Sequence, residues 1–363
     1  MTPPLSTRAG GVSLLPGPPL LHPSVRRAMG EAPISHRSPE FVDRLERCRR
    51  ILCKLTGAAN VQVFVGSGTA ANDTVAAQLA LRGEIGLVLH AGEFGHRLCD
   101  HARRAGLEFH EAQARWGSDH DFVTARRLLE EHPEIRWIWS VHCETSTGRL
   151  HDLDPLRRLA ESHHADLVLD CISSVGAVPI DLSGIAFATA VSGKALASFA
   201  GLAMVFHSRP IGSDSRLPRS LDLGAHAQSP TVPFTQSSNL VGALEAALSR
   251  FQSGGRCTVE PRWQATRELA ASIHDALERR GLTPLTPLAA SSPAVTTVEL
   301  PQGTASLELG DALARRGLHL SYRSEYLRHR NLIQICLMGE HHRSEIEAFF
   351  ETLDLLSERA PAS

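Results

Sequence analysis

Short apolar runs alternate with amphipathic stretches over the first two thirds of the chain. The runs are rich in β-branched and aromatic residues, as expected for buried strands, and lie at 61–65, 85–90, 107–111, 137–141, 166–170, 185–192 and 201–206. Helical periodicity separates most of them, for example at 123–131, and also precedes the first one at 40–55. Alternating strands and helices predict an α/β fold with a seven-stranded, mostly parallel sheet covered on both faces.

The last third of the chain predicts a smaller α/β unit. A Pro-, Ser- and Gly-rich connection at 209–233 leads to a helix at 239–251 and a Gly-containing hinge at 253–255. Further helices are predicted at 256–280, 306–316 and 341–356, and strands at 295–300, 318–322 and 332–337. At the other end, residues 1–20 are rich in Pro and Gly and predict an arm without a core element. We therefore divide the chain into an arm (1–20), a large domain (21–252) and a small C-terminal domain (253–363).

Composition excludes several classes of protein. The net charge of −2 provides no basic field for nucleic acid, and no apolar run has the ~20 residues of a membrane span. The N-terminus has no signal-peptide apolar region. The 7 cysteines are odd in number and lack CxxC spacing, which argues against disulfides or zinc and favours a reducing cytoplasm. The histidine pairs are adjacent, so neither makes a ready chelate, and we expect no metal.

Lysine is almost absent, and this directs attention to Lys194. Lys and Arg together number 37, yet only Lys54 and Lys194 are lysines. Unlike Arg, a lysine whose pKa is lowered can act as an amine nucleophile. Lys54 lies in an amphipathic stretch, whereas Lys194 follows an apolar run and has small neighbours. Lys194 is either a lysine that is present by chance, without a functional role, or a lysine that forms a Schiff base with a cofactor.

Other candidate residues lie where predicted strands end. Gly66-Ser67-Gly68-Thr69 joins a strand to a helix and suits either a phosphate or a plain tight turn with an N-cap. Asp170 ends the fifth run and either caps the next turn or holds a pyridine nitrogen protonated. Phe94 either stacks on a planar ring or packs within its loop. The polar stretch 142–148 could equally be a capping loop.

A phosphate cradle, a stacking ring, a carboxylate and a lone lysine fit pyridoxal phosphate (PLP) best. With these residues in place, the chain resembles the class V aminotransferases of PLP fold type I, especially the alanine–glyoxylate/serine–pyruvate and 2-aminoethylphosphonate–pyruvate branch. The resemblance covers about residues 14–350. Its motifs are LLPGP at 14–18, SHRSPEF at 35–41, GSGTAAND at 66–73, GEFGHR at 92–97, HCETSTG at 142–148, LDCISSVGAVPID at 169–181, SGK at 192–194, RSLDL at 219–223, FTQ at 234–236 and LMG at 337–339.

The resemblance implies a role for each matching residue. Lys194 would form the Schiff base with PLP, Asp170 would pair with the pyridine nitrogen, and Phe94 would stack on the ring. The remaining cofactor contacts would come from Ser67, Gly68, Thr69, Ser192 and either Thr147 or Ser146. Thr235 would reach the partner subunit's cofactor, making the enzyme a homodimer with active sites at the interface, and Gly17 would lie near the substrate.

The chain departs from the family pattern on the substrate side. Gln334 stands where the family usually has an Arg that binds the substrate carboxylate, and Gln cannot form a charged bidentate pair. Arg328 or Arg330 could substitute. Gly193 replaces the usual Gln or Asn before the lysine, and the Pro-Gly that usually follows the lysine is missing.

The resemblance predicts a transaminase that moves an amino group between a small amine or amino acid and a keto acid or aldehyde, with pyruvate or glyoxylate favoured as acceptor. Lys194 would also act as general base and acid. A PLP-dependent lyase or aldolase on the same fold is the alternative, because fold does not select the reaction. A non-catalytic dimeric binding protein is a more remote one.

Overall fold

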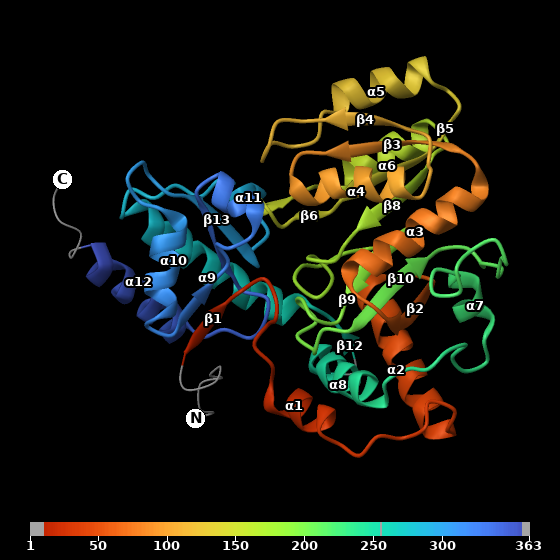
Figure 1. Ribbon diagram of the computed structural model, residues 1–363, viewed down its shortest axis with the longest axis horizontal. Helices are drawn as coiled ribbons and strands as arrows, with labels where there is room; N and C mark the ends of the chain where they lie inside the picture. The colour runs from red at the N-terminus through yellow and green to blue at the C-terminus, as the bar shows by residue number, and fades with distance from the viewer. Residues whose placement is uncertain (1–10, 255, 358–363) are drawn as a thin grey trace.

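A seven-stranded sheet forms the centre of the larger part of the protein (Figure 1). The computed structural model describes residues 11–254 and 256–357. Along the sheet the strands are ordered β2 (Asn60–Val65), β10 (Leu202–His207), β9 (Phe187–Val191), β8 (Asp166–Asp170), β5 (Ile135–Val141), β3 (Ile85–His90) and β4 (Phe109–Gln113). Only β10 runs against its neighbours in this sheet. The predicted α/β class and mostly parallel seven-stranded sheet are confirmed.

Helices cover both faces of this sheet, as the apolar runs predict. One face packs against α2 (Pro39–Thr56), α5 (Phe122–Glu131), α6 (Leu153–Ser162) and α8 (Ser238–Leu248). The other packs against α3 (Gly68–Arg82), α4 (Glu93–Arg104) and α7 (Leu223–Gln228). Because both faces are buried, the interior strands are mostly apolar rather than alternating, whereas the edge strand β4 is more polar and only partly buried.

Local signals set the helix ends. The Ser38 side chain accepts the Phe41 N–H at the start of α2, Pro39 occupies the first turn, and Gly57 ends the helix with φ of 69°. Ser67 caps α3 in the same way by accepting the Ala70 N–H.

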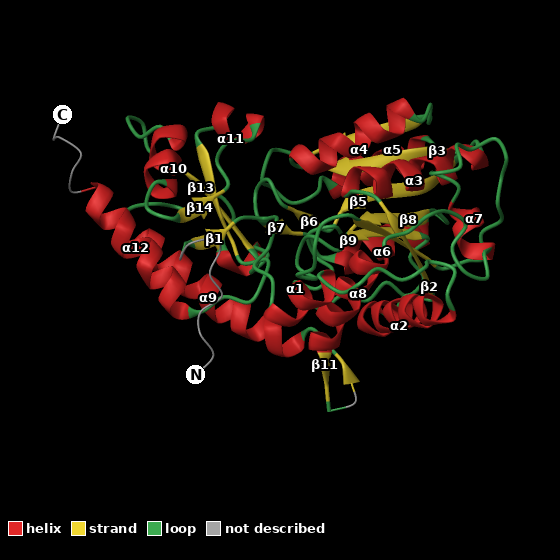
Figure 2. Cartoon of the chain, turned by 60° about the horizontal axis from the view of Figure 1, so that its bottom comes forward, coloured by secondary structure: helices red, strands yellow, loops and turns green. Residues whose placement is uncertain are grey.

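The C-terminal elements form a second apolar core beside the sheet (Figures 1 and 2). Its strands are β13 (Val295–Glu299), β14 (Leu318–Leu320) and β15 (Leu332–Cys336), and its helices are α9 (Glu260–Glu278), α10 (Ser306–Ala314), α11 (Glu325–His329) and α12 (Arg343–Ser357). β13 and β15 pair antiparallel, and Ser321 after β14 bridges to Gln334.

The N-terminal arm contributes a core element, which the sequence does not predict. Val12–Leu14 form β1, which pairs in parallel with β14, and Leu14 is fully buried in the second core. The expectation of an arm without a core element is therefore wrong for these residues. The strand has only three residues and lies between glycines and prolines, so its alternation of apolar and polar positions is too short to predict a strand. Residues 1–10 of the predicted arm lie outside the described residues.

Short elements account for the other differences. α1 (Pro23–Met29), α7 and α11 are not predicted, and Gln252–Ser253 pairs with Arg256–Cys257 as a hairpin (β11, β12) where a helix start is expected. Gly255 of the predicted hinge and residues 358–363 of the predicted small domain lie outside the described part of the chain. The domain boundary at 252/253 stays a prediction.

Candidate active site

A cavity lies at the edge of the sheet where the parallel strands end. It brings together five residues that the sequence singles out, namely Gly68, Thr69, Phe94, Asp170 and Lys194. It is also lined by polar residues that the sequence analysis does not select, among them Asn72, Arg97, His101, Cys143, Thr145 and Ser173. Strand-end convergence places them here, because every strand of the sheet except β10 ends at this edge.

Lys194 follows β9 and is partly buried in the cavity wall. Burial lowers the pKa of its amine, and the opposing effects of Cys336, Cys143 and Asp170 are smaller. The backbone of Gly17 lies alongside, since a Cβ on Gly17 would stand 3.9 Å from Lys194 Cδ and 3.1 Å from the Gly193 carbonyl oxygen. Gly17 therefore lies next to the lysine, and its place near the substrate stays a prediction.

Asp170 ends β8 and is 5% exposed. Its Oδ1 accepts the Ile172 N–H at 2.9 Å, and its Oδ2 accepts the Asn72 side-chain N–H at 2.9 Å. Burial raises the pKa of this carboxyl, while those two hydrogen bonds and the nearby His101 and Lys194 oppose the shift.

The N-terminus of α3 provides an anion-binding feature at the cavity. The first N–H groups of a helix lack intrahelical partners and carry partial positive charge. Gly68 lies in this first turn, and a Cβ there would stand 2.7 Å from Ile172 Cδ1, so a larger residue would clash. Ser67 and Thr69 are exposed in the single chain. Ser67 caps the helix and does not line the cavity, whereas Thr69 does.

Phe94 is positioned by a buried carboxylate on a neighbouring strand. The Glu144 carboxylate, on β6 (Cys143–Glu144), accepts the backbone N–H of Phe94 at 3.3 Å and of Gly95 at 2.9 Å. It thereby caps α4, whose own N-cap residue Gly92 has no side chain. A Cβ on Gly92 would stand 2.5 Å from Glu144, so glycine is needed for this approach. Burial raises the pKa of Glu144, against these hydrogen bonds.

The turn after β6 presents Thr145 to the cavity rather than Ser146 or Thr147. Thr145 Oγ1 lies 2.6 Å from Ser173 Oγ, and both residues line the cavity. Ser146 Oγ donates to Glu144 and accepts the Glu93 N–H, and Thr147 Oγ1 donates to the Glu144 carbonyl. Of these three residues, Thr145 is the one that lines the cavity, and the cofactor contact expected of Thr147 or Ser146 stays a prediction.

Two further predicted cofactor contacts lie away from the cavity lining. Ser192 is fully buried, and its hydroxyl donates to the Phe199 carbonyl at 2.6 Å and accepts the Leu202 N–H at 3.2 Å. Ser192 therefore shapes the loop that carries Lys194. Thr235 is exposed on the surface of the single chain.

Gln334 is fully buried, and its side chain is engaged by neighbours. The amide donates to the Thr145 carbonyl and, at 3.0 Å, to Thr297 Oγ1, and it accepts from the Tyr326 hydroxyl at 3.2 Å. Because both amide hydrogens are used, Gln334 supports the wall of the cavity and is not free to bind a substrate.

Arg330, considered as a substitute cation, is exposed and outside the cavity lining. Its guanidinium lies 4.0 Å from the Trp116 ring centroid. The rings of Trp116 and Phe94 flank Tyr326 with centroids 6.4 and 6.3 Å away. Arg97, over the Phe94 ring at 5.0 Å, does line the cavity, and its guanidinium is ion-paired with Glu93 at 3.0 Å.

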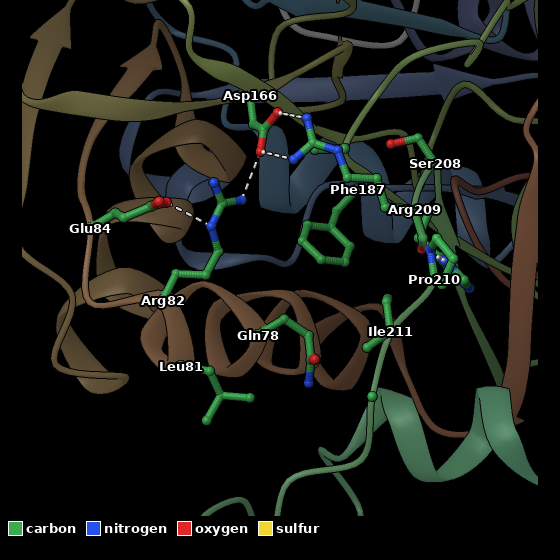
Figure 3. A pocket seen from close by; sticks show the side chains of 13 residues that line it. Gln78, Leu81, Arg82, Glu84, Asp166, Phe187, Ser208, Arg209, Pro210 and Ile211 are labelled. Atoms are coloured by element: carbon green, nitrogen blue, oxygen red, sulfur yellow. Dashed lines mark hydrogen bonds and ion pairs between the residues drawn. The ribbon is translucent and has the colours of Figure 1, made fainter.

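A second cavity lies at the opposite edge of the sheet, near the start of β8 (Figure 3). Asp166 there forms ion pairs with Arg82 at 2.8 Å and Arg209 at 3.0 Å, and Arg82 also pairs with Glu84. The charges balance one another, so this cavity presents no uncompensated group to a ligand.

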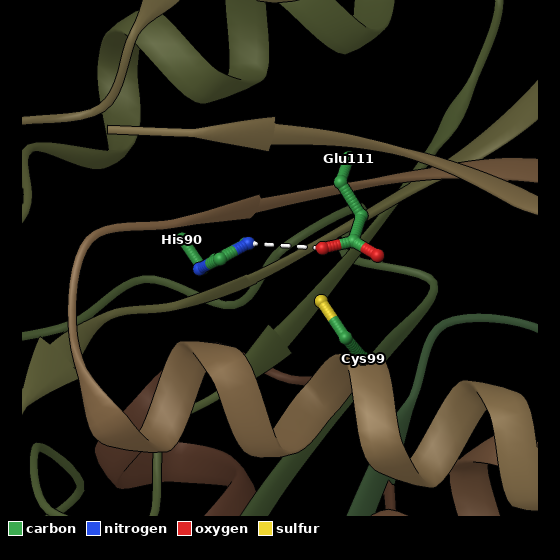
Figure 4. Close-up of side chains that lie close together, drawn as sticks. All are labelled: His90, Cys99 and Glu111. Atoms are coloured by element: carbon green, nitrogen blue, oxygen red, sulfur yellow. Dashed lines mark hydrogen bonds and ion pairs between the residues drawn. The ribbon is translucent and has the colours of Figure 1, made fainter. Parts of the chain in front are cut away.

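Two clusters of metal-ligand residue types occur among the described residues, each with its ligand atoms within 4.8 Å of one another. One is His110, His132 and Glu134, and the other, which includes Cys99 of α4, is His90, Cys99 and Glu111 (Figure 4). In the second cluster two features argue against a metal. Arg103 pairs with Glu111, so a guanidinium already neutralises the carboxylate. Burial raises the pKa of Cys99 to about 12, so the thiol stays protonated near neutral pH. We interpret the cluster as an internal polar network. The absence of a metal stays a prediction.

Two of the residues that the sequence analysis does not select contribute indirectly. Asn72 and Glu144 act on other site residues, Asp170 and Phe94, and both stand inside motifs that the sequence analysis quotes for other positions. For Glu144 the sequence did offer a signal: a glutamate just after a buried strand is costly to bury unless it is hydrogen-bonded, which points to a structural partner.

Comparison with known proteins agrees with this geometry. The sequence profile described as aminotransferase class-V matches residues 26–322. A 2-aminoethylphosphonate–pyruvate transaminase from Aeromonas hydrophila is 28% identical over 304 residues, covering 79% of this chain and 80% of that protein. An uncharacterised aminotransferase from Methanocaldococcus jannaschii is 28% identical over 302 residues, covering 80% and 78%.

Solved structures share the fold across nearly the whole chain. An alanine–glyoxylate aminotransferase from Nostoc sp. superposes with a TM-score of 0.84 at 26% identity, covering 98% of this chain and 97% of that one. A ureidoglycine–glyoxylate aminotransferase from Bacillus subtilis has a TM-score of 0.86 at 21% identity, covering 97% and 95%.

Proposed function

Because the chain belongs to the class V aminotransferase family, we propose that it is a transaminase whose PLP cofactor binds in the Lys194 cavity. The observation that carries this proposal is that a lysine, a buried carboxylate, an aromatic ring and a helix N-terminus line one cavity. The reaction moves an amino group from a small amine or amino acid to a keto acid or aldehyde. Pyruvate or glyoxylate is the favoured acceptor, as the names of the Aeromonas and Nostoc relatives support.

The residues present fit PLP. The N-terminus of α3 at Gly68 and Thr69 suits its phosphate, Asp170 its pyridine nitrogen, and Phe94 the face of its ring. Lys194 would hold the cofactor covalently through its amine, and Thr145, from the turn after β6, lines the same cavity. When bound, PLP supplies an electron sink for removal of a proton from the substrate carbon that bears nitrogen.

Lys194 also supplies the proton transfer. Burial favours its neutral amine, which is the form that can accept a proton. Asp170, whose ionised form is favoured by its two hydrogen bonds, would supply the negative charge that a protonated pyridine needs.

We further propose that the enzyme acts as a homodimer with Thr235 directed to the partner's cofactor. Exposure of Thr235, Ser67 and Thr69 in the single chain supports this. On the substrate side Arg97 is a cation that lines the cavity, so we place the substrate anion nearer to Arg97 than to Gln334. No described helix is long and apolar enough to cross a membrane. The cytoplasmic location stays a prediction, which the unpaired cysteines support.

The test is to load the purified protein with PLP, reduce it with borohydride and map the modified peptide. We expect the label on Lys194 and none in Lys194→Ala. Amines are then screened for conversion of the bound cofactor to its pyridoxamine form, with pyruvate and glyoxylate restoring the starting spectrum. Lys54→Ala is the matched control, because it removes the other lysine and should change neither result.

Three results would contradict the proposal. Labelling elsewhere would overturn the assignment of Lys194. Release of ammonia or a cleaved carbon fragment without a keto-acid acceptor would indicate a lyase or aldolase. No uptake of PLP by the folded wild type would favour the non-catalytic binding protein.

A further inference from the structure

The Asp170 carboxylate is held by a relay of buried side chains from two other elements. Thr189 Oγ1, on β9, donates to Asn72 Oδ1 at 2.9 Å, and Asn72 Nδ2, on α3, donates to Asp170 Oδ2 at 2.9 Å. Thr189 is fully buried, and Asn72 and Asp170 are each 5% exposed. Asn72 and Asp170 both line the cavity.

The fold makes this relay specific. Asp170 and Thr189 are register partners on the adjacent parallel strands β8 and β9, and α3 lies over them, which lets Asn72 reach both. An ionised Asp170 can only accept, so the amide nitrogen of Asn72 faces it, and the amide oxygen then faces the Thr189 hydroxyl, which donates. A flipped amide would set its oxygen against the carboxylate and leave both acceptors without a proton between them.

From this geometry we propose that Asn72, oriented by Thr189, is a positioning residue that keeps Asp170 ionised and aimed into the cavity. The inference rests on the proposed PLP function. Its physical basis is that a buried carboxylate tends to take up a proton, and hydrogen bonds from fixed donors favour its charged form. A protonated Asp170 would not stabilise a protonated pyridine.

Other groups near Asp170 do not replace this donor. His101 on α4 and Lys194 after β9 act on Asp170 through charge, and Cys143 and Cys171 are thiols whose pKa burial raises. The Ile172 N–H binds the other carboxylate oxygen. Asn72 is therefore the side-chain donor on Oδ2 among the described residues.

The experiment measures PLP affinity by titrating the apoprotein and following the absorbance of the bound cofactor. Asn72→Leu, which keeps the branched heavy-atom skeleton and removes the donor, should weaken PLP binding roughly 10- to 100-fold, the range for a lost hydrogen bond to a charged group. Thr189→Val, which removes only the orienting donor, should weaken it by a smaller factor. Thr74→Val is the matched control, because Thr74 is buried on α3 and bonds only the Ala70 carbonyl.

Two further measurements separate positioning from a merely structural role. In an Asp170→Ala background, Asn72→Leu should add little, because its effect passes through Asp170. Asn72→Asp should bind PLP with an affinity that rises with pH relative to the wild type, because two adjoining carboxyls share one proton at lower pH and a protonated pyridine favours the form that has lost it.

The outcomes are distinct. Wild-type PLP affinity in folded Asn72→Leu, or a full additional loss in the Asp170→Ala background, overturns the relay. If Asn72→Leu does not fold, Thr189→Val decides, and wild-type affinity there overturns the relay. Failure of the wild type to bind PLP, or to be labelled at Lys194, overturns the proposed function instead.

Discussion

At the scale of single residues, the site depends on buried polar groups whose partners come from other elements. Glu144 shows why this matters. Glu144 is 1% exposed, and its carboxylate accepts hydrogen bonds from backbone N–H groups in the first turn of α4. Phe94 is therefore positioned by a residue 50 positions away in the sequence. A buried acceptor of this kind stabilises the helix end only while it is present.

We expect Glu144→Ala to lower the free energy of unfolding by about 2–3 kcal/mol, because it leaves two backbone donors buried without an acceptor. Urea denaturation measures the loss. Glu93→Ala is the control, since Glu93 forms an ion pair with Arg97 on the surface of the same helix and should change stability by less than about 0.5 kcal/mol. A loss below about 0.5 kcal/mol in Glu144→Ala would contradict the capping role.

At the scale of elements, β15 ties the C-terminal core to the cavity through Gln334. The side chain joins β13 at Thr297, α11 at Tyr326 and the turn after β6 at Thr145. An Arg at this position, as the family usually has, would enter a fully buried space whose polar neighbours, the Thr145 carbonyl and the Thr297 and Tyr326 hydroxyls, are neutral. Placing a guanidinium there would bury a charge among neutral groups.

Gln334→Arg is therefore expected to destabilise the protein by about 2–4 kcal/mol, from overpacking and charge burial, without improving binding of a keto acid. Thermal unfolding and the KM for the acceptor are the measurements. Exposed Gln302→Arg adds the same charge and serves as the control. A stable Gln334→Arg enzyme with lower KM would show that position 334 faces the substrate.

At the scale of the whole molecule, buried neutral histidines make stability depend on pH. Burial lowers the pKa of His142 to about 3 and of His226 to about 4, from 6.5. The unfolded chain binds the extra protons in this window, so stability is lost as pH falls from about 6.5 toward the folded pKa values.

Each histidine should reduce the free energy of unfolding by up to about 1.4 kcal/mol per pH unit within its window. Chemical denaturation at several pH values from 7 to 4 measures the slope. His142→Gln should make the slope shallower, whereas His329→Gln, at an exposed position, should leave it unchanged. Equal slopes in the wild type and His142→Gln would contradict this account.

Features that depend on neighbouring residues could be predicted from the sequence, whereas features that depend on distant ones could not. The seven strands and long helices follow from hydrophobic period and capping residues, which are local. Lys194, Asp170, Phe94 and Gly68 could be placed together because parallel strands end at one edge of the sheet. β1 could not be predicted, because Leu14 is buried only by pairing with β14, some 300 residues later in the chain, and the surrounding glycines and prolines predict a loop.

The sequence by itself determined the fold class, the family resemblance and the lysine on which the proposed chemistry rests. Only the tertiary structure decided which of Thr145, Ser146 and Thr147 lines the cavity. It also showed that neighbouring residues occupy the hydrogen-bonding groups of the Gln334 side chain, and that Asn72 lies between Thr189 and Asp170. The physical reason is that residue type and period record whether a side chain is buried, while its hydrogen-bond partners depend on elements brought together by folding.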